Sequence, residues 1–202
     1  MTKIKLCGLS RPCDIEAAAA LMPEYVGFVF AEKSRRYVTP GKAAELKRLL
    51  PPGIRAVGVF VDARPETIAA LLNDGVIDMA QLHGHETEED VRRLRQLTGR
   101  PLIQAFRVET ADDLQAAERS TADEILLDSG AGTGTAFDWT LLRDAARPYF
   151  LAGGLSPENV AGAVTLLRPY AVDVSSGIET GGVKDRMKMA AFVAAVRKAG
   201  GI

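Results

Sequence analysis

Short apolar runs alternate along the chain with longer segments in which apolar residues recur at helical spacing. Most of the short runs are continuous rather than strictly alternating, which is typical of strands that are covered on both faces. Eight such runs occur, at residues 3–7, 25–30, 55–61, 79–83, 101–106, 124–128, 149–153 and 171–175. The pattern therefore predicts eight buried strands.

The segments between these runs have the apolar spacing of helices. They cover residues 12–22, 39–50, 64–75, 86–99, 113–119, 137–146, 156–168 and 185–200. Asp14 and Thr39 are candidate N-terminal caps, and Pro40 suits the first helical position after Thr39. Gly75 is a candidate C-terminal stop, and Ser156 marks the expected start of the seventh helix.

Strands and helices thus alternate in eight strand–helix pairs from one end of the chain to the other. Such alternation is typical of a parallel sheet whose helices pack outside it. Eight pairs predict an α/β protein made of a single (β/α)8 barrel, the TIM barrel, over residues 1–202. A doubly wound sheet with fewer strands is the alternative. No linker rich in proline, glycine or serine suggests a boundary between two domains.

The composition narrows the classes of partner. The 202-residue chain has a formal net charge of -1, which gives no electrostatic reason to expect nucleic acid or a membrane surface as a partner. No apolar run approaches the roughly 20 residues that span a bilayer, and the N-terminal segment lacks the apolar stretch of a signal peptide. We therefore expect a cytoplasmic protein with two reduced cysteines. Two cysteines and two histidines without metal-ligand spacing also predict no metal site.

In a (β/α)8 barrel, the chemistry lies at the carboxyl ends of the strands and in the loops that follow them. In this chain those positions are rich in polar and reactive residues. They hold Cys7, Arg36, Asp62, His83, Arg107, Asp128, the pair Gly153 and Gly154, and the stretch Ser175, Ser176 and Gly177. Core packing does not call for so many polar residues, and they form the candidate active site.

Several of these residues also have a structural interpretation. Cys7 ends an apolar strand and is either a small core residue or, with a lowered pKa or partial exposure, a base or nucleophile. Asp128 either caps the loop SGAGTGT or acts in catalysis. The three glycines of that loop suit a segment that closes over a ligand, and a simple flexible turn explains them equally well. His83 ends its strand either as a structural residue or as a substrate contact.

Two glycine stretches late in the chain point to a phosphate. LAGGLSPEN follows the seventh predicted strand, and VSSGIETGG follows the eighth. In (β/α)8 barrels the loops after these two strands often bind phosphate through backbone N–H groups, and glycine lets the backbone approach closely. The two stretches together predict a small phosphorylated substrate.

The whole chain resembles the phosphoribosylanthranilate isomerase family of tryptophan biosynthesis. The segments that carry the resemblance are KIKLCGL, VGFVFAEKSRRYVTP, RAVGVFVD, QLHGHE, ILLDS, GTGTAFDW, LAGGLSPENV and VDVSSGIE, in the order and spacing of that family. The resemblance implies a (β/α)8 barrel that performs an Amadori rearrangement. N-(5-phosphoribosyl)anthranilate would become 1-(2-carboxyphenylamino)-1-deoxyribulose 5-phosphate, with neither a metal nor an organic cofactor.

The resemblance also implies roles for three side chains. The general base of the family, the cysteine of its K-x-C-G pattern, falls on Cys7. The general acid, the aspartate of its L-L-D pattern, falls on Asp128, and the arginine that binds the anthranilate carboxylate falls on Arg36. The chemistry asks for an acid that keeps its proton near neutral pH, which desolvation of Asp128 would favour, and for a base that is partly thiolate.

The phosphate loops of the family fall on Gly153 and Gly154 and on Ser176 and Gly177, and His83 completes the substrate-binding set. Two positions depart from the family. Ser129 stands where threonine is frequent, and Thr135 stands where lysine is common. We expect these differences to tune loop closure or turnover rather than to abolish activity.

Three other functions suit a barrel of this kind. A sister isomerase of the histidine pathway would carry aspartates at the ends of strands one and five, where this chain has Cys7 and the segment QAFR. A ribulose-phosphate epimerase would need a metal and more histidines and aspartates. A non-catalytic binding module would not need Cys7, Asp128, Arg36 and both glycine loops together. Whether the protein is a monomer or a homodimer stays open.

Overall fold

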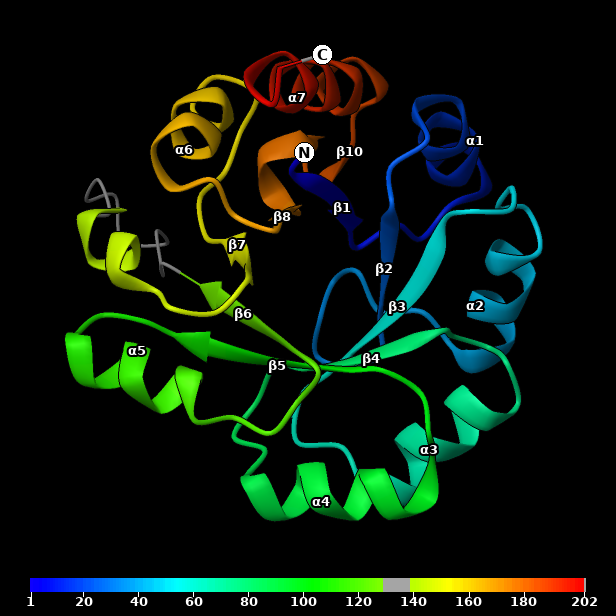
Figure 1. Cartoon of the computed structure of the whole chain (residues 1–202). Helices are drawn as coiled ribbons and strands as arrows, with labels where there is room; N and C mark the ends of the chain where they lie inside the picture. Colours follow the sequence, from blue (N-terminus) through cyan, green and yellow to red (C-terminus); the bar gives the residue numbers. More distant parts are fainter. Residues whose placement is uncertain (129–138, 202) are drawn as a thin grey trace.

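Eight parallel strands close into a barrel in the computed structural model, which describes residues 1–128 and 139–201. The strands are β1 (Lys3–Cys7), β2 (Tyr25–Val29), β3 (Arg55–Phe60), β4 (Met79–Leu82), β5 (Leu102–Arg107), β6 (Glu124–Asp128), β7 (Tyr149–Ala152) and β8 (Ala171–Val174). They follow one another around the ring in chain order, and β1 pairs with β8 to close it (Figure 1). The predicted (β/α)8 barrel is confirmed, and the doubly wound alternative is wrong.

Helices surround the barrel (Figure 1). Those of the described residues are α1 (Pro12–Leu21), α2 (Pro40–Lys47), α3 (Pro65–Asn73), α4 (Glu88–Leu97), α5 (Ala111–Glu118), α6 (Val160–Leu167) and α7 (Arg186–Ala199), with the 3-10 helices η1 (Trp139–Asp144) and η2 (Ser176–Ile178). None of the helices in this part of the chain is long and apolar enough to cross a membrane.

Most predicted helix ends are confirmed, and three details are wrong. Thr39 caps α2 by accepting from the Lys42 backbone N–H. Asp14 acts from the third position of α1, where its carboxylate accepts from the backbone N–H groups of Ser10 and Arg11. The helix expected at 137–146 is only the 3-10 helix η1 over its described part. The helix expected to begin at Ser156 is α6, which begins at Val160. A turn comes before it, in which the Asn159 side chain accepts from the Ser156 backbone N–H.

The apolar residues form two separate clusters, one on each face of the barrel wall. The larger cluster lies between strands and helices. The smaller cluster fills the barrel interior with Tyr25, Val57, Met79, Ile103, Leu126, Phe150, Ala152 and Ala171. Strands buried on both faces explain why the apolar runs are continuous in the sequence.

A short antiparallel ribbon follows the last barrel strand and was not expected from the sequence. It consists of β9 (Glu179–Thr180) and β10 (Val183–Lys184), joined to β8 through η2. Asp185 then caps α7 by accepting from two backbone N–H groups. The ribbon places Glu179 and Lys184 beside the carboxyl ends of β8 and β1.

Candidate active site

A cavity of about 710 Å³ opens at the carboxyl ends of the strands. Its lining includes the predicted site residues Cys7, Arg36, His83, Asp128, Gly153, Gly154 and Ser176. A concave site of this size suits a small molecule that is largely enclosed. The structure therefore brings together residues from β1 and β6 and from the segments after β2, β4, β7 and β8.

The glycine loops after β7 and β8 meet each other at one side of this cavity. Gly153 and Gly154 have φ angles of 93° and 60°, a left-handed conformation that favours glycine. Gly177 lies behind the cavity wall, where an added Cβ would be 1.9 Å from the carbonyl oxygen of Leu155. Gly177 thus allows the two loops to pack together, and its contact with a phosphate stays a prediction.

Two other polar residues from the strand ends have separate roles. Arg107 lines the cavity and pairs with Glu109 at 2.6 Å. Asp62 lies outside the cavity lining and accepts from the His85 backbone N–H at 2.6 Å. Of these two, only Arg107 stays a candidate for contact with a ligand.

Cys7 is buried at the end of β1, with 7% of its surface exposed. Burial raises the pKa of the Cys7 thiol, and the positive charge of Lys5 opposes that rise. The Asp173 carboxylate raises the pKa further, and Lys184 lowers it. The free protein therefore holds Cys7 mainly as a thiol, and its use as a base depends on the positive charges nearby.

Asp128 faces His83 across the opposite part of the cavity. Their closest atoms, Asp128 Oδ2 and His83 Nε2, are 3.7 Å apart, and the two side chains keep 30% and 35% exposure. His83 Nδ1 lies 2.7 Å from the Gln81 amide nitrogen. With that amide assigned as the donor, the His83 proton is on Nε2 and points toward Asp128.

The loop that follows Asp128 falls outside the described residues. Its glycines Gly130, Gly132 and Gly134, and the family departures Ser129 and Thr135, lie there. The expected closure of this loop over a ligand stays a prediction.

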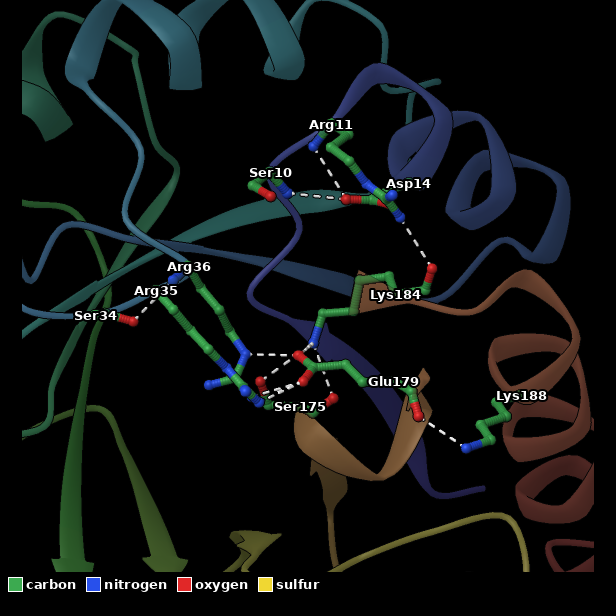
Figure 2. Close-up of polar contacts among 10 residues, drawn as sticks. All are labelled: Ser10, Arg11, Asp14, Ser34, Arg35, Arg36, Ser175, Glu179, Lys184 and Lys188. Atoms are coloured by element: carbon green, nitrogen blue, oxygen red, sulfur yellow. Dashed lines mark hydrogen bonds and ion pairs between the residues drawn. The ribbon is translucent and has the colours of Figure 1, made fainter. Parts of the chain in front are cut away.

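Arg36 lies in a network of charged side chains centred on Glu179 (Figure 2). Its Nε donates to Glu179 Oε1 at 2.6 Å, and its Nη2 donates to Oε2 at 3.0 Å. Arg35 and Lys184 donate to the same carboxylate at 2.8 and 2.7 Å. A guanidinium has a second edge, formed by Nη1 and Nη2, that can bind another carboxylate in bidentate fashion.

Glu179 is charged although it is buried. Burial alone would raise its pKa, but the hydrogen bonds and charges of Arg36 and Lys184 lower the pKa of Glu179 to about 2. Burial also lowers the pKa of Lys184, and Glu179 opposes that change. The network therefore fixes Arg36 beside the cavity through a permanent negative charge.

Sequence reasoning missed five polar residues that support the site, namely Lys5, Gln81, Asp173, Glu179 and Lys184. Asp173 carried a usable signal, because it is a charge between apolar residues of a strand and must find a partner there. Within the described residues, no group of three or more histidine, cysteine, aspartate or glutamate side chains is arranged to hold a metal ion.

Nearly the whole chain is similar to one family of known proteins. The family model for N-(5'-phosphoribosyl)anthranilate (PRA) isomerase matches residues 4–195. The N-(5'-phosphoribosyl)anthranilate isomerase of Ralstonia nicotianae is 44% identical, over 98% of this chain and 94% of that protein.

Solved structures show the same fold. The phosphoribosyl anthranilate isomerase of Thermotoga maritima superposes with a TM-score of 0.90 at 36% identity, covering 98% of this chain and 100% of that chain. An isomerase in complex with reduced 1-(o-carboxyphenylamino)-1-deoxyribulose 5-phosphate superposes with a TM-score of 0.88 at 36% identity and the same coverage. With nearly its whole length matched by the family model, the chain belongs to the phosphoribosylanthranilate isomerase family.

Proposed function

We propose that this protein converts N-(5-phosphoribosyl)anthranilate into 1-(2-carboxyphenylamino)-1-deoxyribulose 5-phosphate in L-tryptophan biosynthesis. The observation that carries the proposal is the convergence of Cys7, Asp128, Arg36 and the glycine loops on one cavity, in a chain of this family. The reaction is an aldose–ketose isomerisation, so it is an intramolecular oxidoreduction. C2′ is oxidised to a ketone while C1′ is reduced to a CH2 group.

Substrate placement follows from the charges around the cavity. The free edge of the Arg36 guanidinium would bind the anthranilate carboxylate, and the backbone of Gly153, Gly154 and Ser176 would bind the phosphate. With both ends of the substrate held, the sugar carbons would lie between Cys7 and Asp128, which both line the cavity. Fixing the reacting atoms in this way removes much of the entropic part of the barrier.

The first chemical step is opening of the ribose ring. Asp128 donates its proton to the ring oxygen, the C1′–O bond breaks, and the nitrogen lone pair forms an iminium at C1′. His83 lies beside Asp128 and is suited to orient the carboxyl group.

The second step is removal of the C2′ proton. The iminium makes this proton acidic, and the Cys7 thiolate accepts it to give an enolamine. The enolamine gains a proton at C1′ and loses the proton of its C2′ hydroxyl to become the ketone. The side chains only donate and accept protons, and the substrate nitrogen assists the cleavage of the C1′–O bond, so we propose a reaction that needs neither a metal nor an organic cofactor.

The test is fluorescence-monitored turnover of freshly generated phosphoribosylanthranilate. We expect robust turnover by the wild type and a loss of at least about 100-fold for Cys7→Ser, the low end for a general base. Cys13→Ser is the matched control, because Cys13 is an exposed thiol that does not line the cavity. Full activity of Cys7→Ser would exclude the cysteine as the base. No turnover by folded wild type would exclude the function and make the sister-barrel aminoaldoses the next substrates to test.

Three wider predictions accompany the function. We propose one domain over residues 1–202 and a cytoplasmic location, where both thiols stay reduced. The ligand is a small phosphorylated molecule.

An isomerase of Thermotoga maritima is described as dimeric. For this chain, monomer and homodimer are the alternatives, and sedimentation equilibrium would distinguish them.

A further inference from the structure

A buried ion pair lies on the side of the cavity that holds Cys7, here called the base side, and the steps above do not use it. Lys5 is fully buried, and its Nζ donates to Asp173 Oδ2 at 2.9 Å. The two residues are register partners on β1 and β8, the strands that close the ring (Figure 1). Buried ion pairs contribute little net stability compared with apolar residues of the same volume. The pair therefore needs an explanation other than stability.

The ion pair lies next to the proposed base. Lys5 and Cys7 are two positions apart on β1, so their side chains point to the same face of the strand. Cys7 and Asp173 both line the cavity. The Lys5 ammonium has three donors, and Asp173 Oδ2 accepts one of them. Asp173 Oδ1 has no hydrogen-bond partner among the described residues.

The charges that face Cys7 are unequal in effect. Lys5 on its own strand opposes the pKa rise caused by burial more strongly than Asp173 on β8 adds to it. Lys184 on β10 contributes a smaller effect of the same sign as Lys5. Other titratable groups line the same cavity, namely Arg36 after β2, His83 after β4, Arg107 on β5 and Asp128 on β6.

Lys5 remains protonated at this position. Burial alone would lower its pKa, but the charge of Asp173 raises the pKa of Lys5 above its ordinary value. Asp173 thus has a role of its own, because it keeps a cation in the barrel interior where a lone lysine would lose its proton.

Building on the proposed function, we propose that Lys5, held in the barrel by Asp173, is the positioning residue that stabilises the thiolate of Cys7. The pair thereby sets the fraction of enzyme that carries a competent base at a given pH. Lys5 need not touch the substrate for this, since it acts through its charge on Cys7.

The experiment measures thiol ionisation independently of turnover. Cys13→Ala leaves Cys7 as the single cysteine of the chain. In that background, the rate of alkylation by iodoacetamide is followed against pH for the parent, Lys5→Met and Lys5→Met/Asp173→Asn. The double variant carries no unpaired buried charge, so it tests the inference if the single variant does not fold. Lys3→Met is the matched control, because Lys3 lies on the same strand face but donates to Tyr170 instead.

We expect the alkylation midpoint to rise by about one pH unit or more in Lys5→Met, which is about a tenfold slower reaction at a fixed pH below the midpoint. The double variant should show a smaller rise, because it also removes Asp173, which raises the pKa of Cys7 less than Lys5 lowers it. The midpoint of Lys3→Met should equal that of the parent. The acidic limb of the kcat/KM profile should move by the same amount, so that raising the pH restores activity to the Lys5 variants. A structural role for Lys5 would not produce that recovery.

An unchanged midpoint in the folded Lys5 variants would overturn the inference and leave the proposed function intact if the parent turns over phosphoribosylanthranilate. A raised midpoint in a parent protein that does not turn over this substrate would support the inference about Cys7 while excluding the proposed function.

Discussion

The base side of the cavity, around Cys7, and the acid side, around Asp128, differ in their access to water. Cys7 and Asp173 are almost fully buried, whereas about a third of each of the Asp128 and His83 side chains is exposed. A group that must become an anion in a buried place needs a fixed countercharge, which Lys5 supplies. An acid that must regain its proton after each turnover benefits from contact with solvent. The difference in burial thus matches the difference in chemical task.

The largest expected effect is the loss of kcat when Asp128, the proposed acid, is replaced. Asp128→Asn removes the proton donor and keeps the shape of the side chain, so kcat should fall by about 100-fold or more. The turnover assay measures this loss, and a circular dichroism melting curve checks that the fold is intact. Asp112→Asn, an exposed change in α5, is the control. Wild-type kcat in Asp128→Asn would remove Asp128 from the mechanism.

Lowering the pH should reduce the free energy of unfolding, because it protonates Glu179. Its pKa in the folded protein is about 2, below the ordinary value of 4.5, so its charge stabilises the fold above about pH 4.5. This stabilisation is lost as the pH falls from about 4.5 to about 2, and it amounts to at most about 3 kcal/mol. Urea unfolding between pH 6 and pH 3 measures it. Glu179→Gln should show a smaller loss over that range, and an equal loss in both proteins would contradict the assignment.

A smaller effect is expected when Glu179→Gln is assayed with substrate. The amide carries no negative charge, and its NH2 group cannot accept from Arg36 or Lys184, so the guanidinium is held less firmly. KM should rise about tenfold, the loss of one such bond, while kcat changes less. Glu45→Gln, which breaks an exposed pair with Lys42, is the control. An effect confined to kcat would mean that Glu179 acts on the chemistry instead.

The smallest effect is expected at His83. Its Nε2 lies 3.7 Å from Asp128 Oδ2, beyond hydrogen-bonding distance, so it orients the acid only weakly in the free protein. His83→Asn should lower kcat/KM by less than about tenfold. His85→Asn, an exposed change at the same mouth, should leave kcat/KM unchanged. A loss as large as that of Asp128→Asn would show that His83 is the proton donor.

The barrel could be predicted from the sequence because most strands are buried on both faces and are therefore nearly continuous apolar runs. Reactive residues at strand ends could also be found, since the fold brings all those ends to one mouth. Lys5 alternates with apolar residues in KIKLC, as a solvent-facing side chain would, and its partner Asp173 is 168 positions away, so only barrel closure shows that they meet. Glu179 lies in a ribbon too short to give any periodic signal.

The pairing of β1 with β8 also has a consequence for folding kinetics. Cys7 gains its buried, charged surroundings only when the first and last strands of the barrel meet. Contacts so distant in sequence form late, because a long loop must close before they are made. In an open-barrel intermediate, Cys7 would react as an ordinary solvated thiol. A pulse of alkylating reagent during refolding would therefore time the closure of the barrel through the residue proposed as the general base.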